Sequence, residues 1–179
     1  AGQSWVVYNS NYSTPGTGYQ YLEQTQGVST SATLWNSTAA TSSVFSVGTN
    51  SQTNTSGGTF IAYCWAAIPG YSAFGNYTGN GSSDGPFVYL GFRPRWIMWK
   101  RTDTTSAWFM YDATRGPGYN IMGQEMYANT NEAEGTTSRM DFLSNGFKLR
   151  AANAGDNASS GTYIYAAFAE IPFKYARAR

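Results

Sequence analysis

The sequence predicts an all-β protein, an antiparallel β-sandwich of jelly-roll type with an internal repeat of about 100 residues. Period-two alternation of apolar and polar residues recurs along the chain, whereas helical periodicity is nearly absent. The alternating runs are rich in Val, Ile, Phe, Tyr and Trp, and clusters of Gly, Asn, Ser and Asp separate them, as in strands joined by turns. The third observation is a duplication: GTFIAYCWAAIP at Gly58–Pro69 returns as GTYIYAAFAEIP at Gly161–Pro172.

The alternation predicts the individual strands in chain order. They are Ser4–Tyr8, Val44–Val47, Thr59–Ala66, Phe87–Phe92, Trp96–Lys100, Ala107–Tyr111, Met140–Leu143, Gly146–Arg150 and Thr162–Ala169. Long polar loops are expected at Thr49–Gly58, Asn76–Gly85 and Ala152–Gly161, because their residues tolerate positive φ or bond their own backbone.

The duplicated segments are expected to be equivalent central strands, ended by Pro69 and Pro172. Alternate residues of Thr59–Ala66 are apolar on both sides, which is typical of a strand buried on both faces or buried in an oligomer. The single cysteine, Cys64, lies in this run and is therefore expected to be a buried, inert thiol. Val44–Val47 would pair with Thr59–Ala66 as a hairpin.

Three more segment pairs follow in the same order, and they suggest two domain-sized units. The pairs are Trp5–Asn9 with Trp108–Asp112, Gly16–Leu22 with Gly116–Met122, and Phe45–Val47 with Phe147–Leu149. We interpret residues 1–73 as the C-terminal part of a first unit and residues 74–179 as a complete second unit, which can pack as one body. The first unit lacks a counterpart of Phe74–Thr104, so we expect a longer chain, another part of the fold or a neighbouring subunit to supply those strands.

The composition excludes some partners. Charged residues make up only 12% of the chain, the net charge is +1, and Glu23 is the only charged residue before Asp84. A nucleic-acid-binding protein needs clustered Lys and Arg, which this sequence does not offer. No apolar stretch approaches the length of a membrane span, so we expect no membrane insertion. A surface of hydroxyls and amides suits neighbouring proteins or neutral ligands such as sugars.

We expect no catalytic, cofactor or metal site. The chain has no histidine, which removes Ser-His-Asp and Cys-His catalysis. Gly81–Gly85 matches G-x-S-x-G but lacks a following helix and a base, so we interpret it as a turn. Glu132 and Glu134 lie in loop sequence with nothing nearby to raise one pKa, as an acid role would require. The Asn and Asp pairs in the loops offer too few oxygen ligands for Ca²⁺.

Loop residues provide one candidate binding site. Sugar-binding surfaces stack rings on Trp or Tyr and fix hydroxyls with Asn, Asp or Arg. Residues of these types in predicted loops are Tyr77, Asn80, Asp84, Arg115 and Tyr119. The alternative is that these aromatic residues pack under loops or at subunit contacts.

Four stretches together resemble a known family. They are SVFSVGTNSQTNTSGGTFIAYCWA, FGNYTGNGSSDGPFVYLGFRPRWIMWKRTDT, DFLSNGFKL and GTYIYAAFAEIPFKYARAR. They are similar to repeated domains of bacteriophage virion proteins, found in tail, fibre and other structural proteins and likened to concanavalin A-like or SPRY-like β-sandwiches. The resemblance implies a homo-oligomer on the virion surface that contacts other copies of itself and other virion proteins. It assigns no site residues.

The sequence and the resemblance together lead us to expect a non-enzymatic bacteriophage structural protein, acting as tail, fibre or capsid decoration. One alternative is a carbohydrate-binding or receptor-binding adhesin that meets a host-surface glycan. Another is a polysaccharide depolymerase, which requires paired carboxylates in a groove.

Overall fold

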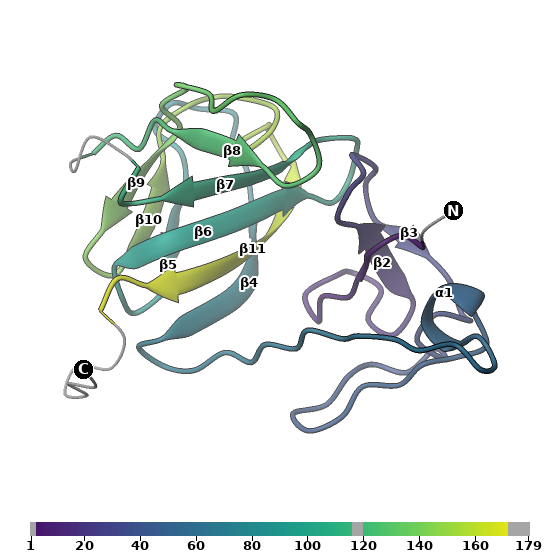
Figure 1. The fold of residues 1–179 in the computed structure, drawn as a ribbon. Helices are drawn as coiled ribbons and strands as arrows, with labels where there is room; N and C mark the ends of the chain where they lie inside the picture. The colour runs from purple at the N-terminus through teal and green to yellow at the C-terminus, as the bar shows by residue number, and fades with distance from the viewer. Residues whose placement is uncertain (1–2, 116–119, 172–179) are drawn as a thin grey trace.

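Antiparallel β-sheets make up nearly all of the regular structure (Figure 1). The computed structural model describes residues 3–115 and 120–171. The elements are β1 (Val6–Val7), β2 (Gly18–Tyr21), β3 (Ser29–Thr30), α1 (Ser51–Asn54), β4 (Ser72–Thr78), β5 (Phe87–Tyr89), β6 (Pro94–Arg101), β7 (Trp108–Asp112), β8 (Glu125–Tyr127), β9 (Met140–Leu143), β10 (Gly146–Leu149) and β11 (Thr162–Ala169). The predicted all-β, antiparallel character is confirmed.

Two sheets pack face to face around the main core. The five-stranded sheet has the order β4-β11-β6-β7-β8, and the three-stranded sheet has the order β5-β10-β9. Buried residues of both sheets form one cluster, in which Phe142 and Phe147 of the smaller sheet meet Trp99 and Tyr163 of the larger one. This arrangement has the two layers of a β-sandwich.

Period-two alternation explains which side chains fill the core. In β6, Ile97 and Trp99 point inward and are fully buried, whereas Met98 between them packs on the outer face. The Trp99 ring stacks on Phe109 of β7, with ring centroids 5.2 Å apart. Aromatic rings of this size bury about 150–250 Å² each, so a few of them supply much of the hydrophobic stabilisation.

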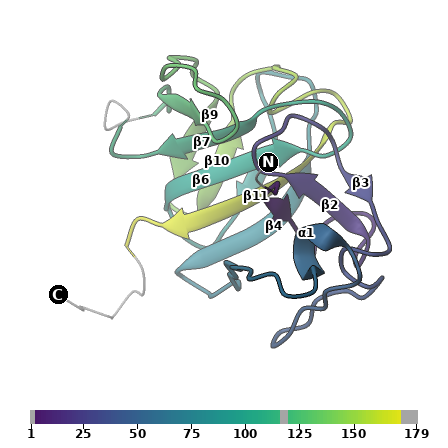
Figure 2. The same ribbon diagram turned by 45° about the vertical axis from the view of Figure 1, so that its right-hand side comes forward.

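Residues 3–71 form a smaller part that lies against the outer face of the five-stranded sheet (Figure 2). Its strands pair in the order β1-β2-β3. The contact is partly apolar: Tyr12, Trp108 and Ile164 share a second buried cluster. It is also polar, because the Trp108 indole N–H donates to the Tyr21 carbonyl over 2.9 Å.

A buried lysine spans this junction. The Lys100 ammonium is fully buried and donates to the carbonyls of Thr25, Gln26 and Arg101 at 3.0, 2.8 and 3.1 Å. Gln20, also fully buried, donates from Nε2 to the carbonyls of Gln26 and Arg101, both over 3.1 Å. Burial lowers the pKa of Lys100 to about 8.

The predicted central strand Thr59–Ala66 is wrong. This segment runs as an extended chain from α1 along the lower side of the molecule to β4 (Figure 1), and it pairs with no strand among the described residues. Every residue from Asn54 to Pro69 is exposed, Cys64 included, so the prediction of a buried thiol is also wrong. The physical reason is that no neighbouring strand flanks the segment, whereas Thr162–Ala169 lies between β4 and β6.

Most other strand predictions were right in place but not always in length, and one more was wrong. Of the predicted Ser4–Tyr8 strand only Val6–Val7 pairs, and Val44–Val47 forms no strand or hairpin. The sequence missed β2, β3, β4 and β8, and the predicted unit boundary between residues 73 and 74 falls inside β4.

Candidate functional site

The predicted sugar-binding residues do not come together. β4 and β7 run antiparallel, because each successive pair from β4 through β11 and β6 to β7 is antiparallel. Asn80 and Asp84 follow the end of β4, whereas Arg115 follows the end of β7, so they lie at opposite ends of the sheet. Tyr119 lies outside the described residues. A single sugar-sized ligand cannot contact both ends.

Tyr77 is a core residue and offers little surface to a ligand. Its side chain is 8% exposed, its ring stacks on Tyr163 with centroids 4.8 Å apart, and its hydroxyl donates to the Asp156 carbonyl over 2.8 Å. Burial, together with the Asp156 charge, raises its pKa well above the ordinary value. The prediction that Tyr77 contacts a glycan is therefore wrong. The residue packs under the loops, as the alternative interpretation expected.

Asn80 is committed to turn structure. Its amide donates to the Asp84 carbonyl over 2.9 Å, and its carbonyl oxygen accepts from the Ser82 N–H and from Asn157 Nδ2. The Asn157 side chain, fully buried, also donates to the carbonyls of Ser82 and Ala151 and thereby joins the two long loops. The G-x-S-x-G match is a closed turn with no strand-to-helix elbow.

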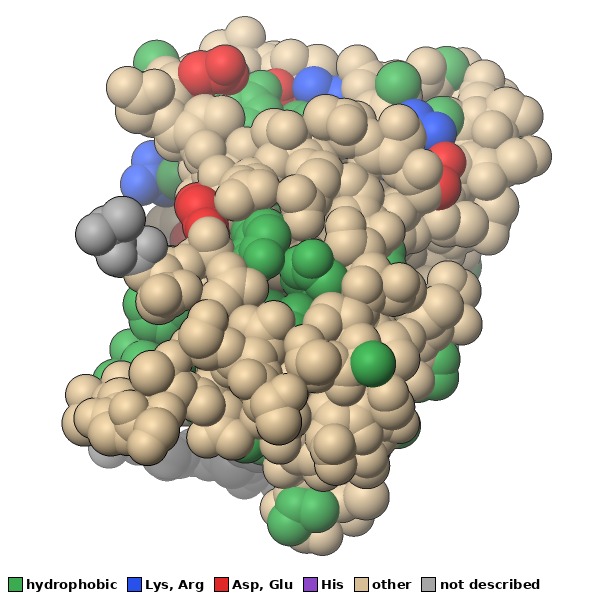
Figure 3. All heavy atoms as spheres, turned by 90° about the vertical axis from the view of Figure 1, so that its right-hand side faces the viewer, with side chains coloured by type: hydrophobic (Ala, Val, Ile, Leu, Met, Phe, Trp, Pro, Cys, Tyr) green, Lys and Arg blue, Asp and Glu red, His purple; other side chains and the backbone are tan. Residues whose placement is uncertain are grey.

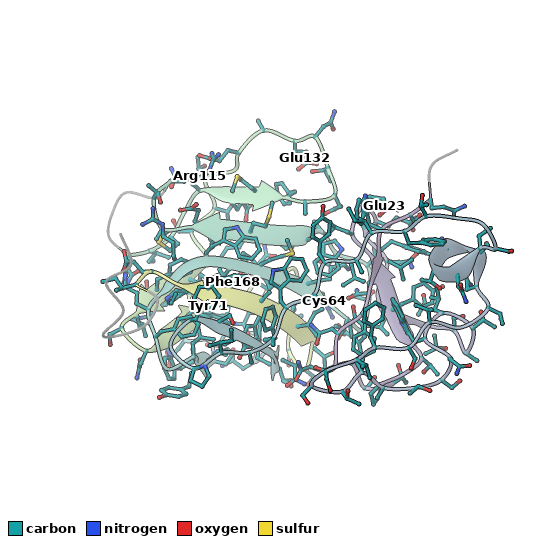
Figure 4. All side chains as sticks on the ribbon, turned by 60° about the horizontal axis from the view of Figure 1, so that its bottom comes forward. Glu23, Cys64, Tyr71, Arg115, Glu132 and Phe168 are labelled. Carbon is teal, nitrogen blue, oxygen red and sulfur yellow. The ribbon has the colours of Figure 1, made fainter. Side chains whose placement is uncertain are left out.

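The two charged candidates are exposed and paired with other side chains. Asp84 contacts the Lys148 ammonium at 2.8 Å, and the hydrogen bond from that ammonium lowers the pKa of the Asp84 carboxyl. Arg115 contacts the Glu134 carboxylate at 2.6 Å at the far end of the sheet, and Figure 4 labels Glu132 apart from Arg115. Surface pairs of this kind contribute about 0–1 kcal/mol and indicate no ligand.

A buried charge cluster also lies in the fold, and no sequence pattern predicts it. Arg139 binds the Glu125 carboxylate through Nε and Nη2, and its Nη1 lies 3.7 Å from the Asp156 carboxylate. Its guanidinium also lies 5.0 Å from the Phe109 ring centroid. Burial raises the Asp156 pKa to about 7, although the Arg139 charge acts to lower it. All three side chains are closed off from solvent, so the cluster holds β8 and two loops together and meets no substrate.

A groove opens where residues 3–71 meet the end of the five-stranded sheet. It has a volume of about 310 Å³. Its lining consists mainly of amides, hydroxyls and tyrosines, and comprises Asn11, Tyr12, Ser13, Val28, Asn76, Tyr77, Thr78, Thr102, Asp103, Thr162, Tyr163 and Ile164. Asp103 is its one carboxylate; the hydrogen bond from Arg101 lowers its pKa, so it stays charged. These groups suit a neutral polyhydroxyl ligand better than an anion.

The most unusual surface is the exposed apolar segment itself. The Trp5, Tyr63 and Trp65 rings form a row, with centroids 6.0 Å apart for the first pair and 6.2 Å for the second. Phe60 and Ile61 beside them are also exposed. Contiguous apolar surface of this kind marks interaction sites in soluble proteins. Figure 3 shows the side of the molecule that lies at the right in Figure 1, and few side chains on that side are charged.

A second aromatic group lies on the sheet. Tyr71, Phe74 and Trp96 surround Phe168, with ring centroids 6.0, 5.9 and 5.8 Å from it. Figure 4 shows Tyr71 and Phe168 together on the outer face of the sheet, with Cys64 apart from them. The group is partly exposed and extends the apolar surface of this face.

Within residues 3–115 and 120–171, no group of three or more Cys, Asp or Glu side chains is placed to hold a metal ion. In the same residues, no helix has the length and apolar character needed to cross a membrane.

Comparison with known proteins gives one relationship. No curated protein and no solved structure matches the chain. A family described as a domain of unknown function, DUF7483, matches residues 1–172, a span that includes both copies of the duplicated segment. The match covers nearly the whole sequence, and the chain therefore belongs to the DUF7483 family.

Proposed function

We propose that this chain is a non-enzymatic structural protein of a bacteriophage particle, displayed on the virion surface as tail, fibre or capsid decoration. The observation that carries the proposal is the exposed, uncharged segment from Asn54 to Pro69 beside a well-packed sandwich. Exposed apolar surface is costly in an isolated protein and is retained where a neighbour covers it. The sequence resemblance to virion domains supports the same role.

In this role the sandwich is a rigid support. Its buried aromatic core and the Arg139–Glu125 pair fix the sheets, and the polar loops are displayed outward. We assign the sandwich to the jelly-roll, concanavalin A-like type and expect the chain to act as a homo-oligomer. Its low charge reduces repulsion between neighbouring copies, which suits close packing in a particle.

The proposed position of this chain on the virion can be tested with purified virions. Mass spectrometry of purified virions is expected to find this chain, and antibody labelling in electron microscopy is expected to place it on the particle surface. Absence of the chain from purified virions would refute the proposal.

Carbohydrate binding is the second candidate, favoured by the neutral groove at the junction. A glycan array tests it with the wild type and Asn76→Ala, whose side chain lines the groove; Asn131→Ala, exposed and outside the groove, is the matched control. Binding that Asn76→Ala abolishes and Asn131→Ala retains would support this function. No binding by the wild type to any host polysaccharide would count against it.

For a depolymerase, a reducing-sugar release assay on host polysaccharide is decisive, and we expect no release. Glu132 and Glu134 are surface residues, and Glu134 is held by Arg115. Release of sugar ends above background would contradict the non-enzymatic proposal.

A further inference from the structure

Equivalent residues of the two repeat copies have opposite environments. Six of the twelve residues of Gly58–Pro69 are identical in Gly161–Pro172, namely Gly58, Thr59, Ile61, Ala66, Ile68 and Pro69. The exposed fractions differ sharply at matched positions: 52% for Trp5 against 4% for Trp108, 50% for Phe60 against 0% for Tyr163, and 67% for Ile61 against 3% for Ile164. Positions that build a core in the second copy are thus open in the first.

The second copy shows which strands pair with such a segment. Thr162–Ala169 pairs along nearly its whole length with β4 on one edge and β6 on the other. Ile164 lies opposite Asn76 and Lys100, and Phe168 lies opposite Ser72 and Trp96. Both neighbouring strands precede Trp108 in the sequence, within or next to Phe74–Thr104, a stretch that is not duplicated within residues 1–179.

The backbone of the first copy is open in the same way. Between Thr59 and Trp65, no residue takes part in a strand ladder in the described part of the chain. An extended segment with unpaired N–H and C=O groups and apolar side chains on both faces is a template for an incoming strand. Pairing with an incoming strand would give the N–H and C=O groups between Thr59 and Trp65 the strand partners that they lack here.

The exposed area is large enough for a stable contact. A large aromatic or aliphatic side chain presents about 150–250 Å² when fully exposed. With the exposed fractions of Trp5, Phe60, Ile61, Tyr63, Trp65 and Ile68, these side chains offer on the order of 700 Å². Stable protein interfaces take about 600–1,000 Å² from each partner, and the exposed area falls within that range.

We propose that Thr59–Ala66 is the acceptor for a β-strand from another polypeptide whose sequence repeats the apolar pattern of Pro94–Arg101. The incoming strand pairs antiparallel with the acceptor through its backbone, and its apolar side chains pack beside Ile61, Tyr63 and Trp65 as cross-strand neighbours. The β6 strand of a second copy is not available, because it is the central strand of its own sandwich. The inference deepens the proposed assembly role and rests on it.

Cys64 provides the measurement. It is the only cysteine, it lies in the middle of the acceptor and it is exposed, so its reaction with a thiol reagent reports whether the segment is covered. The full chain is mixed with a synthetic peptide of residues 93–102, which contains the β6 strand. With peptide at about ten times its dissociation constant, labelling is expected to slow about tenfold. A scrambled peptide of the same composition should leave the rate unchanged.

A pair of proline variants separates strand pairing from nonspecific sticking. Ala62→Pro removes a backbone donor from the acceptor and prevents regular pairing, so the peptide should no longer protect Cys64. Ser56→Pro is the matched control, since residue 56 follows Thr55 in a turn closed by the Gly58 N–H to the Thr55 carbonyl, with Gly57 at φ +72°. Proline suits that position, so protection should persist.

Three results would overturn the proposal. The first is fast labelling at saturating peptide; the second is slowing that follows the concentration of the chain alone, which would assign the segment to a second copy; the third is slowing by oligosaccharide but not by peptide. The assay uses purified protein, so its failure leaves placement on the virion standing. Conversely, absence from virions would leave a positive labelling result standing.

Discussion

Substitution of one isoleucine at two matched positions tests how different the environments of the two duplicated sequence segments are. Ile164→Ala removes three carbon atoms from a side chain that is 3% exposed and packs with Tyr12 and Trp108. At about 0.8 kcal/mol for each buried carbon, plus the cavity left behind, the expected loss is about 3 kcal/mol. Ile61→Ala makes the same change on a side chain that is 67% exposed, so the expected loss is below about 1 kcal/mol.

Urea unfolding followed by tryptophan fluorescence and circular dichroism measures the loss in free energy of unfolding for each of the two variants. For a domain of this size, a loss of about 3 kcal/mol lowers the melting temperature by about 6–12 °C, and Ile61→Ala should change it by less than a third of that. The slope of the free energy of unfolding against urea should stay unchanged in both variants. Equal losses at the two positions would refute the conclusion that Ile61 is uncovered in the isolated chain.

Further predictions concern buried charges and a loop anchor. Burial lowers the Lys100 pKa from 10.5 to about 8, so the folded state gives up this proton first; the wild type should gain stability relative to Lys100→Met as pH rises from 8 to 10 in thermal melts. Burial raises the Asp156 pKa from 3.8 to about 7, so the wild type should lose stability relative to Asp156→Asn as pH rises from 4 to 7; a flat difference would contradict the assignment. Asn157→Ala leaves the carbonyls of Ser82 and Ala151 without this donor and should cost about 2–4 kcal/mol, with faster amide exchange in Gly79–Gly85.

The sequence predicted the long apolar strands of the sandwich but missed β2, β3, β4 and β8. The predictions at Trp96–Lys100, Ala107–Tyr111, Met140–Leu143 and Thr162–Ala169 were confirmed. The same alternation at Thr59–Ala66 gave a wrong prediction, because a strand needs partners and periodicity reports only the side-chain pattern.

β4 was missed for the opposite reason: its residues look like a turn. Gly75 and Asn76 favour loops in isolation, but a Cβ on Gly75 would lie 2.6 Å from the Tyr165 hydroxyl oxygen of β11. The glycine therefore makes room for an aromatic ring on the adjacent strand, which only the pairing of β4 with β11 explains.

The candidate site was harder to predict than the fold. Residue types suitable for sugars occur in several loops, yet only the strand directions show that Asn80 and Arg115 lie at opposite ends. Glu125, Arg139 and Asp156 have no spacing pattern that would join them in a sequence. The aromatic row at Trp5, Tyr63 and Trp65 also forms only through the fold.

Amide hydrogen exchange on the purified chain tests the central claim most directly, because it compares Thr59–Ala66 with Thr162–Ala169 in one molecule. We predict exchange at the rate of an unstructured peptide for the first segment and strong protection for the second. Comparable protection in both segments, at a concentration where the chain is monomeric, would show that the first copy already has its neighbours and needs no incoming strand.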